Sequence, residues 1–314
     1  SYYDRDTPTE QEIRTIAEQL YNNADWTWTQ VPDGTVSMGW GPEKQFIDYQ
    51  WHGLDEAMIL YVMALGSETH PIDEKAWSAW TSTYKWGTYY GQDHLGFPPL
   101  FGHQYSQIWI DFRGIQDAYM RERGIDYFEN SRRATLAQHS YAVDNPGNWD
   151  DYGEDIWGLT ACYGPLDATV NVHGTPRKIA TYTARGADFM GVNDDGTIAP
   201  TAAVSSIVFA PEIVLPTIAA MEVKYGNNLY LQYGFVDAFN PSLKDGSTTV
   251  DFGKIVPGVG WFDTSYLGID QGPIVAMIEN YRSELIWKTM RRNPHIIHGL
   301  KRAGFTGGWL EKTE

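Results

Sequence analysis

Aromatic residues lie mainly in the segments between the predicted helices of this chain, rather than on regular helical stripes. The 314 residues include 13 Trp and 20 Tyr. The segments 85–115 and 145–200 are rich in glycine, proline and aromatic residues, and they contain few periodic runs. Irregular segments of that length are usually functional or disordered, and the aromatic content favours order. The chain is therefore expected to consist of helices joined by long, ordered aromatic loops.

Apolar residues recur at helical spacing in several other segments. Thr7, Pro8 and Glu10 make a good helix start, because threonine can cap, proline suits the first position and glutamate completes a capping box. Alternating tryptophans between residues 25 and 50 predict a short β-hairpin with exposed rings. We expect seven or eight helices, near residues 8–22, 54–65, 71–83, 125–143, 201–210, 211–225, 271–290 and 294–303. The fold class is mainly α, and we expect one domain over residues 1–314.

Charge and motif content exclude several classes of function. The net charge of −17 disfavours nucleic acids and anionic membranes, whereas a neutral polymer is compatible with it. The single cysteine, Cys162, excludes an intrachain disulfide. The sequence has no phosphate-binding loop, dinucleotide fingerprint or serine elbow, and no stretch long enough to cross a bilayer. His295 and His298 lack a third ligand, so neither a metal nor a cofactor is expected.

Two acidic segments carry the chemical signal. Glu56 follows a tryptophan and a histidine in segment 51–56 (WHGLDE), and Glu154 lies among glycines and aromatic rings in segment 152–158 (YGEDIWG). Glycosidic-bond hydrolysis needs a proton donor and a second carboxylate, and flat rings bind sugars. The alternatives are structural. Glu56 could complement the dipole of the helix expected at 54–65, and Glu154 could be a solvated loop acid.

Asp237 and Asp270 are further acids in aromatic surroundings. Asp270 also suits the N-cap of the helix expected at 271–290. Glu56, Glu154, Asp237 and Asp270 are thus the candidate catalytic residues. The candidate sugar-contacting residues are Trp40, Trp51, His103, Tyr105, Trp157, Tyr163, Trp261, Tyr266 and Arg282, although each ring could equally belong to the core.

Several segments together resemble the bacterial glucoamylase-like family, which includes β-1,2-glucan hydrolases and a domain of cyclic β-1,2-glucan synthases. The segments run in the family's order, and they are 51–57, 145–161, 200–203, 233–240 and 269–282. The resemblance implies an (α/α)₆ toroid that acts without metal on a β-1,2-glucosidic bond. It places Glu56 at the family's proposed acid position and Glu154, Asp237 and Asp270 at acidic positions lining the pocket.

The chain departs from the family at three places. An early acid-rich motif of the type Asp-Gly-Gly-Asp-Leu-Val-Glu is absent, the Ser-Asp-Gly-Pro-like stretch reads CYGP at 162–165, and Asp55 replaces the usual asparagine. The first departure implies that the chain is the C-terminal portion of a larger domain, lacking its N-terminal helices. A partner N-terminal segment of the same protein and a periplasmic or secreted location are further expectations.

The predicted function is hydrolysis or transglycosylation of a β-linked glucan, most specifically β-1,2-glucan, by carboxylate acid–base catalysis. The expected partner is an oligo- or polysaccharide, with no nucleic acid and no membrane insertion. A carbohydrate-binding protein without catalysis would need the same aromatic rings but no paired acids. A polysaccharide lyase is a third alternative, and the acidic loops disfavour it because lyases acting on uronates generally need basic residues.

Overall fold

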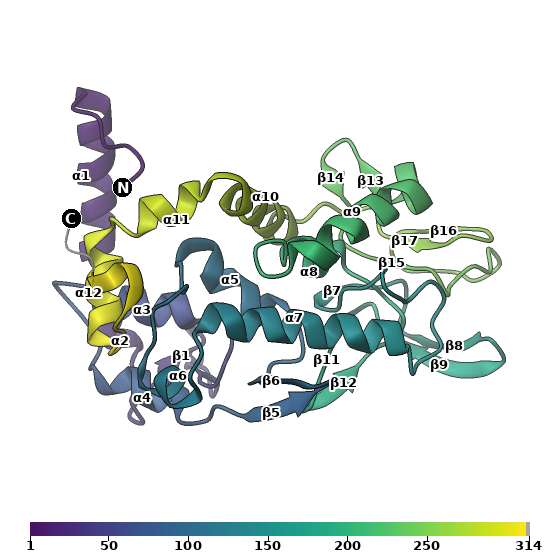
Figure 1. Cartoon of the computed structure of the whole chain (residues 1–314), viewed down its shortest axis with the longest axis horizontal. Helices are drawn as coiled ribbons and strands as arrows, with labels where there is room; N and C mark the ends of the chain where they lie inside the picture. The colour runs from purple at the N-terminus through teal and green to yellow at the C-terminus, as the bar shows by residue number, and fades with distance from the viewer. Residues whose placement is uncertain (312–314) are drawn as a thin grey trace. The chain divides into compact units, whose positions relative to one another are not determined.

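The computed structural model describes residues 1–311, and their regular structure is mainly helical with small antiparallel sheets (Figure 1). Two compact units make up the chain. Unit 1 comprises Ser1–Lys85, Ser106–Glu129 and the chain from Glu284 onward, whereas unit 2 comprises Trp86–Tyr105 and Asn130–Ser283. The boundary falls within two helices, α5 (Phe101–Trp109) and α7 (Tyr127–Asp144). That residues 1–314 act as a single domain stays a prediction.

Helices dominate unit 1. The predicted first helix is confirmed, since the Thr7 hydroxyl accepts a hydrogen bond from the backbone N–H of Glu10 at 3.3 Å. The helices wholly in this unit are α1 (Pro8–Asn22), α2 (Trp26–Thr29), α3 (Met58–Gly66), α4 (Lys75–Thr81), α6 (Ala118–Arg123), α11 (Leu285–Met290), α12 (Pro294–Arg302) and the short 3₁₀ helix η2 (Gly308–Glu311).

Helices α3 and α12 pack against each other through glycines (Figure 1). A Cβ atom added to Gly66 would lie 2.1 Å from the carbonyl oxygen of His295, and one added to Gly299 would lie 1.9 Å from that of Val62. Side chains at these two positions would therefore collide with the backbone of the facing helix. The glycines allow the close helix contact that holds α3 in unit 1.

A two-stranded ribbon spans residues 36–51 and confirms the predicted hairpin. It is built from β1 (Val36–Ser37), β2 (Trp40–Gly41), β3 (Gln45–Phe46) and β4 (Gln50–Trp51). Val36 pairs with Trp51, and Trp40 pairs with Phe46, so the register shifts by one residue between the two pairs. Such a shift is a β-bulge, which increases the twist of the ribbon. Trp26 and Trp28 lie in helix α2 rather than in a strand, contrary to the alternation pattern.

Unit 2 combines helices with short hairpins. The loops expected at 85–115 and 145–200 are partly regular, which corrects the prediction. The helices wholly in this unit are α8 (Pro200–Val204), α9 (Pro211–Tyr225), η1 (Gly226–Asn228) and α10 (Gly268–Ser283). The strands are β5 (Trp86–Tyr89), β6 (Gln92–Leu95), β7 (Ala161–Tyr163), β8 (Ala168–Val172), β9 (Thr175–Ile179), β10 (Tyr182–Ala184), β11 (Gly186–Asp188), β12 (Gly191–Asn193), β13 (Tyr230–Leu231), β14 (Gly234–Phe235), β15 (Phe239–Asn240), β16 (Lys254–Val256) and β17 (Gly260–Phe262).

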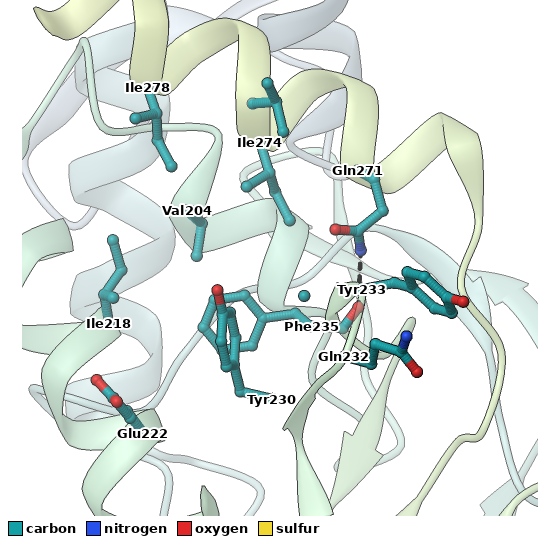
Figure 2. Close-up of a pocket in the computed structure, with 12 residues that line it drawn as sticks. Val204, Ile218, Glu222, Tyr230, Gln232, Tyr233, Phe235, Gln271, Ile274 and Ile278 are labelled. Atoms are coloured by element: carbon teal, nitrogen blue, oxygen red, sulfur yellow. Dashed lines mark hydrogen bonds between the residues drawn. The ribbon is translucent and has the colours of Figure 1, made fainter. Parts of the chain in front are cut away.

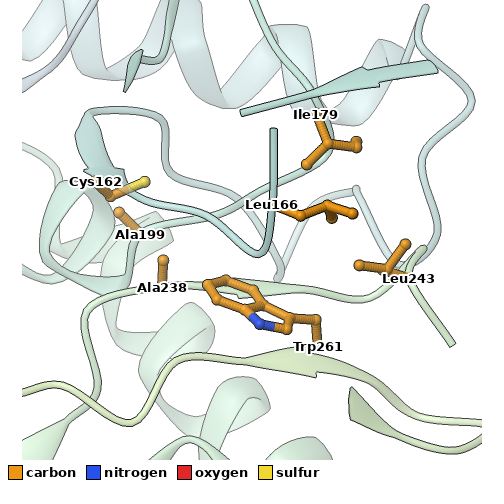
Figure 3. Packing of buried hydrophobic residues seen from close by; sticks show 7 residues of the cluster. All are labelled: Cys162, Leu166, Ile179, Ala199, Ala238, Leu243 and Trp261. Atoms are coloured by element: carbon orange, nitrogen blue, oxygen red, sulfur yellow. The ribbon is translucent and has the colours of Figure 1, made fainter. Parts of the chain in front are cut away.

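The hydrophobic core of unit 2 fixes the segment that carries Asp237, one of the candidate acids. Trp261 packs with Ala238, Leu243 and Leu166 in this cluster, and Ala238 directly follows Asp237 in the chain (Figure 3). Nearby, the buried Arg185 guanidinium forms a bidentate ion pair with Asp195, with both N–O distances at 2.7 Å. The same guanidinium donates to the carbonyl of Cys162 at 2.7 Å and so holds strand β7 in place.

The single helix predicted at 271–290 is two helices, α10 and α11. Glu284 separates them because its backbone adopts the left-handed conformation, with φ of 59°. Its carboxylate bonds Arg113 at 2.9 Å and lies 3.7 Å from Arg291. The residues from 1 to 311 form twelve α-helices rather than seven or eight, because several have only four to six residues. Within this range, every helix is too short or too polar to cross a membrane.

Candidate functional site

Glu56 lies in a tight turn immediately before helix α3, rather than in the first turn of the helix as predicted. The Asp55 carboxylate accepts a hydrogen bond from the N–H of Ala57 at 2.8 Å. On the other side, the Ser106 hydroxyl donates to the carbonyl of Glu56 and accepts from the N–H of Ile59, both at 3.0 Å. These bonds fix the backbone on both sides of Glu56, so its side chain starts from a defined position.

The environment of this turn favours protonated carboxyl groups. The Glu56 side chain is half-buried, and its burial raises the pKa of the carboxyl above its ordinary value. Asp55 is buried, and desolvation together with the neighbouring Glu56 charge raises its pKa to about 7. Burial disfavours the charged form of an acid. Glu56 therefore combines access to solvent with a pKa shifted in the direction that a proton donor requires.

Three buried aspartates come together in unit 2, near the start of helix α10. The backbone N–H of Asp237 donates to Ser265 at 3.1 Å, and the N–H of Asp263 donates to Ala238 at 2.9 Å, so two chain segments run side by side. The Asp237 carboxylate accepts from the N–H of Tyr163 at 2.7 Å. Asp270 is the third residue of α10 and not its N-cap, which corrects one alternative for this residue.

Asp237 and Asp270 behave as a coupled pair. Burial is the largest cause in both, and it raises the pKa of Asp237 to about 6 and that of Asp270 to about 9. Oδ1 of Asp237 and Oδ2 of Asp270 are buried and receive no hydrogen bond from an N–H or O–H group of the described residues. Two ionised carboxylates have no proton to share, whereas a singly protonated pair can form a hydrogen bond between its members. Burial and repulsion between neighbouring carboxylates therefore raise the pKa of both carboxyls and favour a protonated form within the pair.

Asp263 is the member of this cluster that the sequence did not reveal. Its charge raises the pKa of both Asp237 and Asp270. One of its oxygens accepts from the N–H of Thr264 at 2.6 Å, and the other is buried without a partner among residues 1–311. The signal available in the sequence was an aspartate directly after the aromatic pair Trp261-Phe262.

Glu154 is exposed, in contrast to the buried aspartates of the same unit. Its backbone carbonyl accepts from the His139 ring at 2.8 Å. It lines an open surface hollow with Tyr90, His139 and Asp144. Glu56 belongs to unit 1, so the predicted cooperation between Glu56 and one of the other three acids stays a prediction.

The predicted sugar-contacting residues fall into two groups. Trp157, Trp261 and His103 are buried, so the structure places them in the core and not on a surface that a sugar could reach. The indole N–H of Trp157 donates to the Thr217 hydroxyl at 2.7 Å, and burial lowers the pKa of His103 to about 3. The remaining residues are at least partly accessible, and they are Trp40, Trp51, Tyr105, Tyr163, Tyr266 and Arg282.

A separate cavity of about 560 Å³ lies in unit 2 between α9, α10 and the hairpin β13–β14 (Figure 2). Aliphatic side chains such as Ile218, Ile274 and Ile278 line one side of it, and Tyr230 and Phe235 line the other. The Gln271 amide donates to the carbonyl of Phe235 at 2.7 Å at its edge. Glu222, Gln232 and Tyr233 add polar groups to its lining.

Comparison with known proteins defines the family. Residues 48–294 match the Glycoamylase family model, which is described as "Putative glucoamylase". The chain belongs to this family, and the resemblance noted in the sequence is confirmed.

Individual relatives extend this result. The chain is 28% identical to an exo-β-1,2-glucooligosaccharide sophorohydrolase (non-reducing end) of Parabacteroides distasonis, and the match covers 96% of this chain and 40% of that protein. A solved structure from Bacteroides uniformis is also described as a "putative glucoamylase" and is 34% identical to this chain, with a TM-score of 0.81. The match covers 99% of this chain and 68% of that one. An endo-β-1,2-glucanase from Chitinophaga pinensis, solved with sophorotriose and glucose, is 28% identical with a TM-score of 0.82, covering 98% and 68% respectively.

Proposed function

We propose that this chain is a glycoside hydrolase, or a transglycosylase, that acts on β-1,2-linked glucan. The observation that carries the proposal is Glu56, a half-buried carboxyl with a raised pKa in a turn held on both sides by hydrogen bonds. The sophorohydrolase and the endo-β-1,2-glucanase support the choice of linkage. Because the chain spans 40% of the length of the curated relative, its activity and substrate are inferred from a partial match.

In the proposed reaction, Glu56 donates its proton to the glycosidic oxygen as the bond from that oxygen to the anomeric carbon breaks. Water, or the hydroxyl of an acceptor sugar, adds to the anomeric carbon and gives its proton to a second carboxylate. Glu154, Asp237 and Asp270 are the candidates for that carboxylate.

Hydrolysis of a panel of β-1,2-, β-1,3- and β-1,4-linked glucans, with sizing of the products, tests the proposal. We expect new reducing ends from the β-1,2-linked polymer and little from the other two. Glucan binding without new reducing ends over a long incubation would instead favour a carbohydrate-binding protein. An ultraviolet-absorbing unsaturated product would indicate a lyase.

We also propose that the helices belong to an (α/α)₆ toroid to which a further N-terminal segment of the same protein contributes. Two observations support this proposal. The solved relatives extend beyond the part that this chain matches. In unit 2, helices α9 and α10 carry exposed apolar side chains, namely Leu215, Val223, Ile269 and Val275, and Val275 lines the cavity shown in Figure 2. Reading the coding sequence upstream of Ser1 tests it, and a stop codon directly upstream would contradict it.

A periplasmic or secreted location is proposed for the same protein. The support is chemical, because a long polysaccharide does not cross a membrane unaided and must be cut where it lies. Fractionation of the producing cells tests the location, and recovery of the protein with the cytoplasmic fraction would contradict it.

A further inference from the structure

We propose that Trp28 and Trp40 form a binding platform for a β-linked gluco-oligosaccharide. The platform consists of these two indole rings and the Phe46 ring beneath them, all in unit 1. The proposal rests on the proposed function for the class of ligand. It adds a binding site for the glucan chain, apart from the candidate catalytic acids, that the similarity to known proteins does not identify.

The three rings come from two elements that are fixed to each other. Trp40 and Phe46 face each other as a cross-strand pair of the ribbon. Trp28, from helix α2, packs over this pair, with ring centroids 5.7 Å from Trp40 and 4.8 Å from Phe46. The corresponding interplanar angles are 56° and 52°, so the rings form an angled surface rather than a flat one. An angled surface suits a chain whose successive sugars turn relative to one another.

The two indoles are unusually accessible for rings that touch each other. Trp28 is 52% exposed and Trp40 is 44% exposed. Met38, Ile47 and Tyr49 of the same ribbon are exposed as well. Single exposed apolar residues are common, whereas Trp28 and Trp40 are two exposed rings in contact with each other, which favours a role in binding. The exposed area is therefore concentrated on one short part of the chain.

The platform is organised before any ligand binds. Asp25 caps helix α2 by accepting from the N–H of Trp28 at 3.2 Å. The end of α2 is tied to the ribbon by a bridge between Gln30 and Val36. The Trp40 indole N–H donates to the Gln45 side chain at 3.3 Å. Rings that are already held lose little conformational freedom on binding, which favours affinity.

The chemistry of the patch favours a neutral sugar over a membrane or a nucleic acid. The ribbon, residues 36–51, contains the acids Glu43 and Asp48 and the base Lys44. This balance provides no basic cluster for phosphate or for anionic lipid. Aromatic faces instead pack well against the C–H faces of glucose rings, while the rim amides and carboxylates can bond hydroxyl groups.

The platform is also continuous with the proposed proton donor. Strand β4 of the ribbon ends at Trp51, and the chain then enters the turn that carries Glu56. Tyr61 of helix α3 fixes this connection, because its hydroxyl donates to the carbonyl of Trp51 at 2.7 Å and accepts from the N–H of Val36 at 3.0 Å. One anchored segment therefore carries both the sugar platform and the acid.

The test measures binding rather than turnover. The Trp28→Ala and Trp40→Ala variants are made in the full chain with Glu56→Gln, so that the ligand is not consumed. Tyr2→Ala is the matched control, since Tyr2 is an exposed ring outside the ribbon and α2. Calorimetric titration uses β-1,2-gluco-oligosaccharides of about ten units or more, and unchanged circular dichroism spectra establish that each variant folds.

We expect each tryptophan variant to bind the oligosaccharide at least about tenfold more weakly, as for truncation of a ring that anchors an interface. The control should bind like its parent. Equal affinity in all variants, or no binding by the parent, would overturn the platform. So would a variant that changes only self-association in sedimentation, because the rings would then bind a second copy.

The outcome separates this inference from the proposed function. Binding through Trp28 and Trp40 by a chain that releases no reducing ends would support the platform and contradict the hydrolase. Hydrolysis by the native chain, combined with unchanged affinity in the tryptophan variants, would support the hydrolase and overturn the platform.

Discussion

The hydroxyl of Ser106 donates a hydrogen bond to the carbonyl of Glu56 over 3.0 Å, and the same hydroxyl accepts from the N–H of Ile59. A residue of helix α5 thereby fixes the turn that precedes helix α3. The Ser106→Ala variant should lower the free energy of unfolding by about 0.5–1.5 kcal/mol, because it removes the hydrogen bonds of two partly buried backbone groups. Urea denaturation measures this change. An unchanged midpoint would show that the turn is stable without the serine.

Replacing Glu56 by glutamine tests its role as the proton donor. The amide keeps the shape of the side chain but cannot donate a proton to the leaving oxygen. The rate constant for β-1,2-glucan should fall by about 10²–10⁴, as expected for loss of general acid catalysis. Glu68→Gln, the same change at an exposed acid after helix α3, is the control. Near-normal turnover by Glu56→Gln would rule out the assigned role.

The Asp270→Asn variant tests whether Asp270 is protonated in the folded chain. The measurement is the thermal midpoint of the variant and of the native chain as a function of pH. The pKa of Asp270 is about 9 in the folded chain, against 3.8 ordinarily, so the folded state holds a proton that the unfolded state has released. Its contribution to stability is complete below about pH 4 and is lost as the pH rises to about 9. Asparagine does not titrate. The variant should therefore gain in thermal midpoint, relative to the native chain, across that range.

Asp245→Asn is the contrasting variant for this measurement. Hydrogen bonds from Ser247 lower the pKa of exposed Asp245 below its ordinary value, so its contribution to stability is present at neutral pH and is lost on acidification. The difference curve for Asp245→Asn should therefore be flat from about pH 4 to pH 9 and change only below about pH 4, whereas the curve for Asp270→Asn should rise across that range. A flat curve for Asp270→Asn would mean that this carboxyl ionises normally in the folded chain.

The buried ion pair of Arg185 and Asp195 should be costly to break on one side. Arg185→Met leaves a buried carboxylate without its guanidinium, which typically costs about 3–5 kcal/mol of unfolding free energy. Adding Asp195→Leu to this variant removes the stranded charge and should restore part of the loss. Urea titrations of both variants measure these differences. A double variant less stable than the single one would contradict the explanation.

Trp157 provides a test of core packing against sugar binding. Trp157→Phe keeps a ring but loses the hydrogen bond from the indole to Thr217 and part of the buried ring volume, so the unfolding free energy should fall by about 1–4 kcal/mol. Glucan affinity should stay unchanged, because the side chain is buried. If glucan affinity fell greatly while the unfolding free energy stayed the same, Trp157 would be a sugar-contacting residue.

Helices with strong end signals could be predicted from the sequence, and those that depend on distant residues could not. Helices α9 and α12 begin at prolines and were placed within about two residues of their observed ends. The break between α10 and α11 was missed because glutamate seldom adopts a left-handed backbone conformation. At this break the Glu284 carboxylate pairs with Arg113 and Arg291. The residues next to Glu284 in the sequence indicate neither its left-handed backbone nor these ion pairs. Strands of two to five residues are also too short to give a periodic pattern.

The sequence indicates which residue types form the candidate site, but it does not indicate which of their side chains are buried in the folded chain. Asp237 is recognisable as a lone acid in an aromatic segment, and Asp270 by its position at the start of a predicted helix, whereas Asp263 has no comparable signal except the preceding Trp261-Phe262 pair. Trp157, Trp261 and His103 were assigned to sugar contact because the sequence does not distinguish a buried ring from an exposed one. Burial depends on contacts such as that between Trp261 and the carbonyl of Phe252, which only the folded chain defines.

The contact between Gly66 and Gly299 has a consequence for the order of synthesis. These residues are far apart in the chain, and all of unit 2 is encoded between them. Unit 2 can reach its native contacts while the ribosome is still translating, whereas α3 must await the emergence of α12. The turn bearing Glu56 is then among the last parts to fold, so a nascent chain released early would contain a folded aspartate cluster in unit 2 and an unfolded acid turn in unit 1.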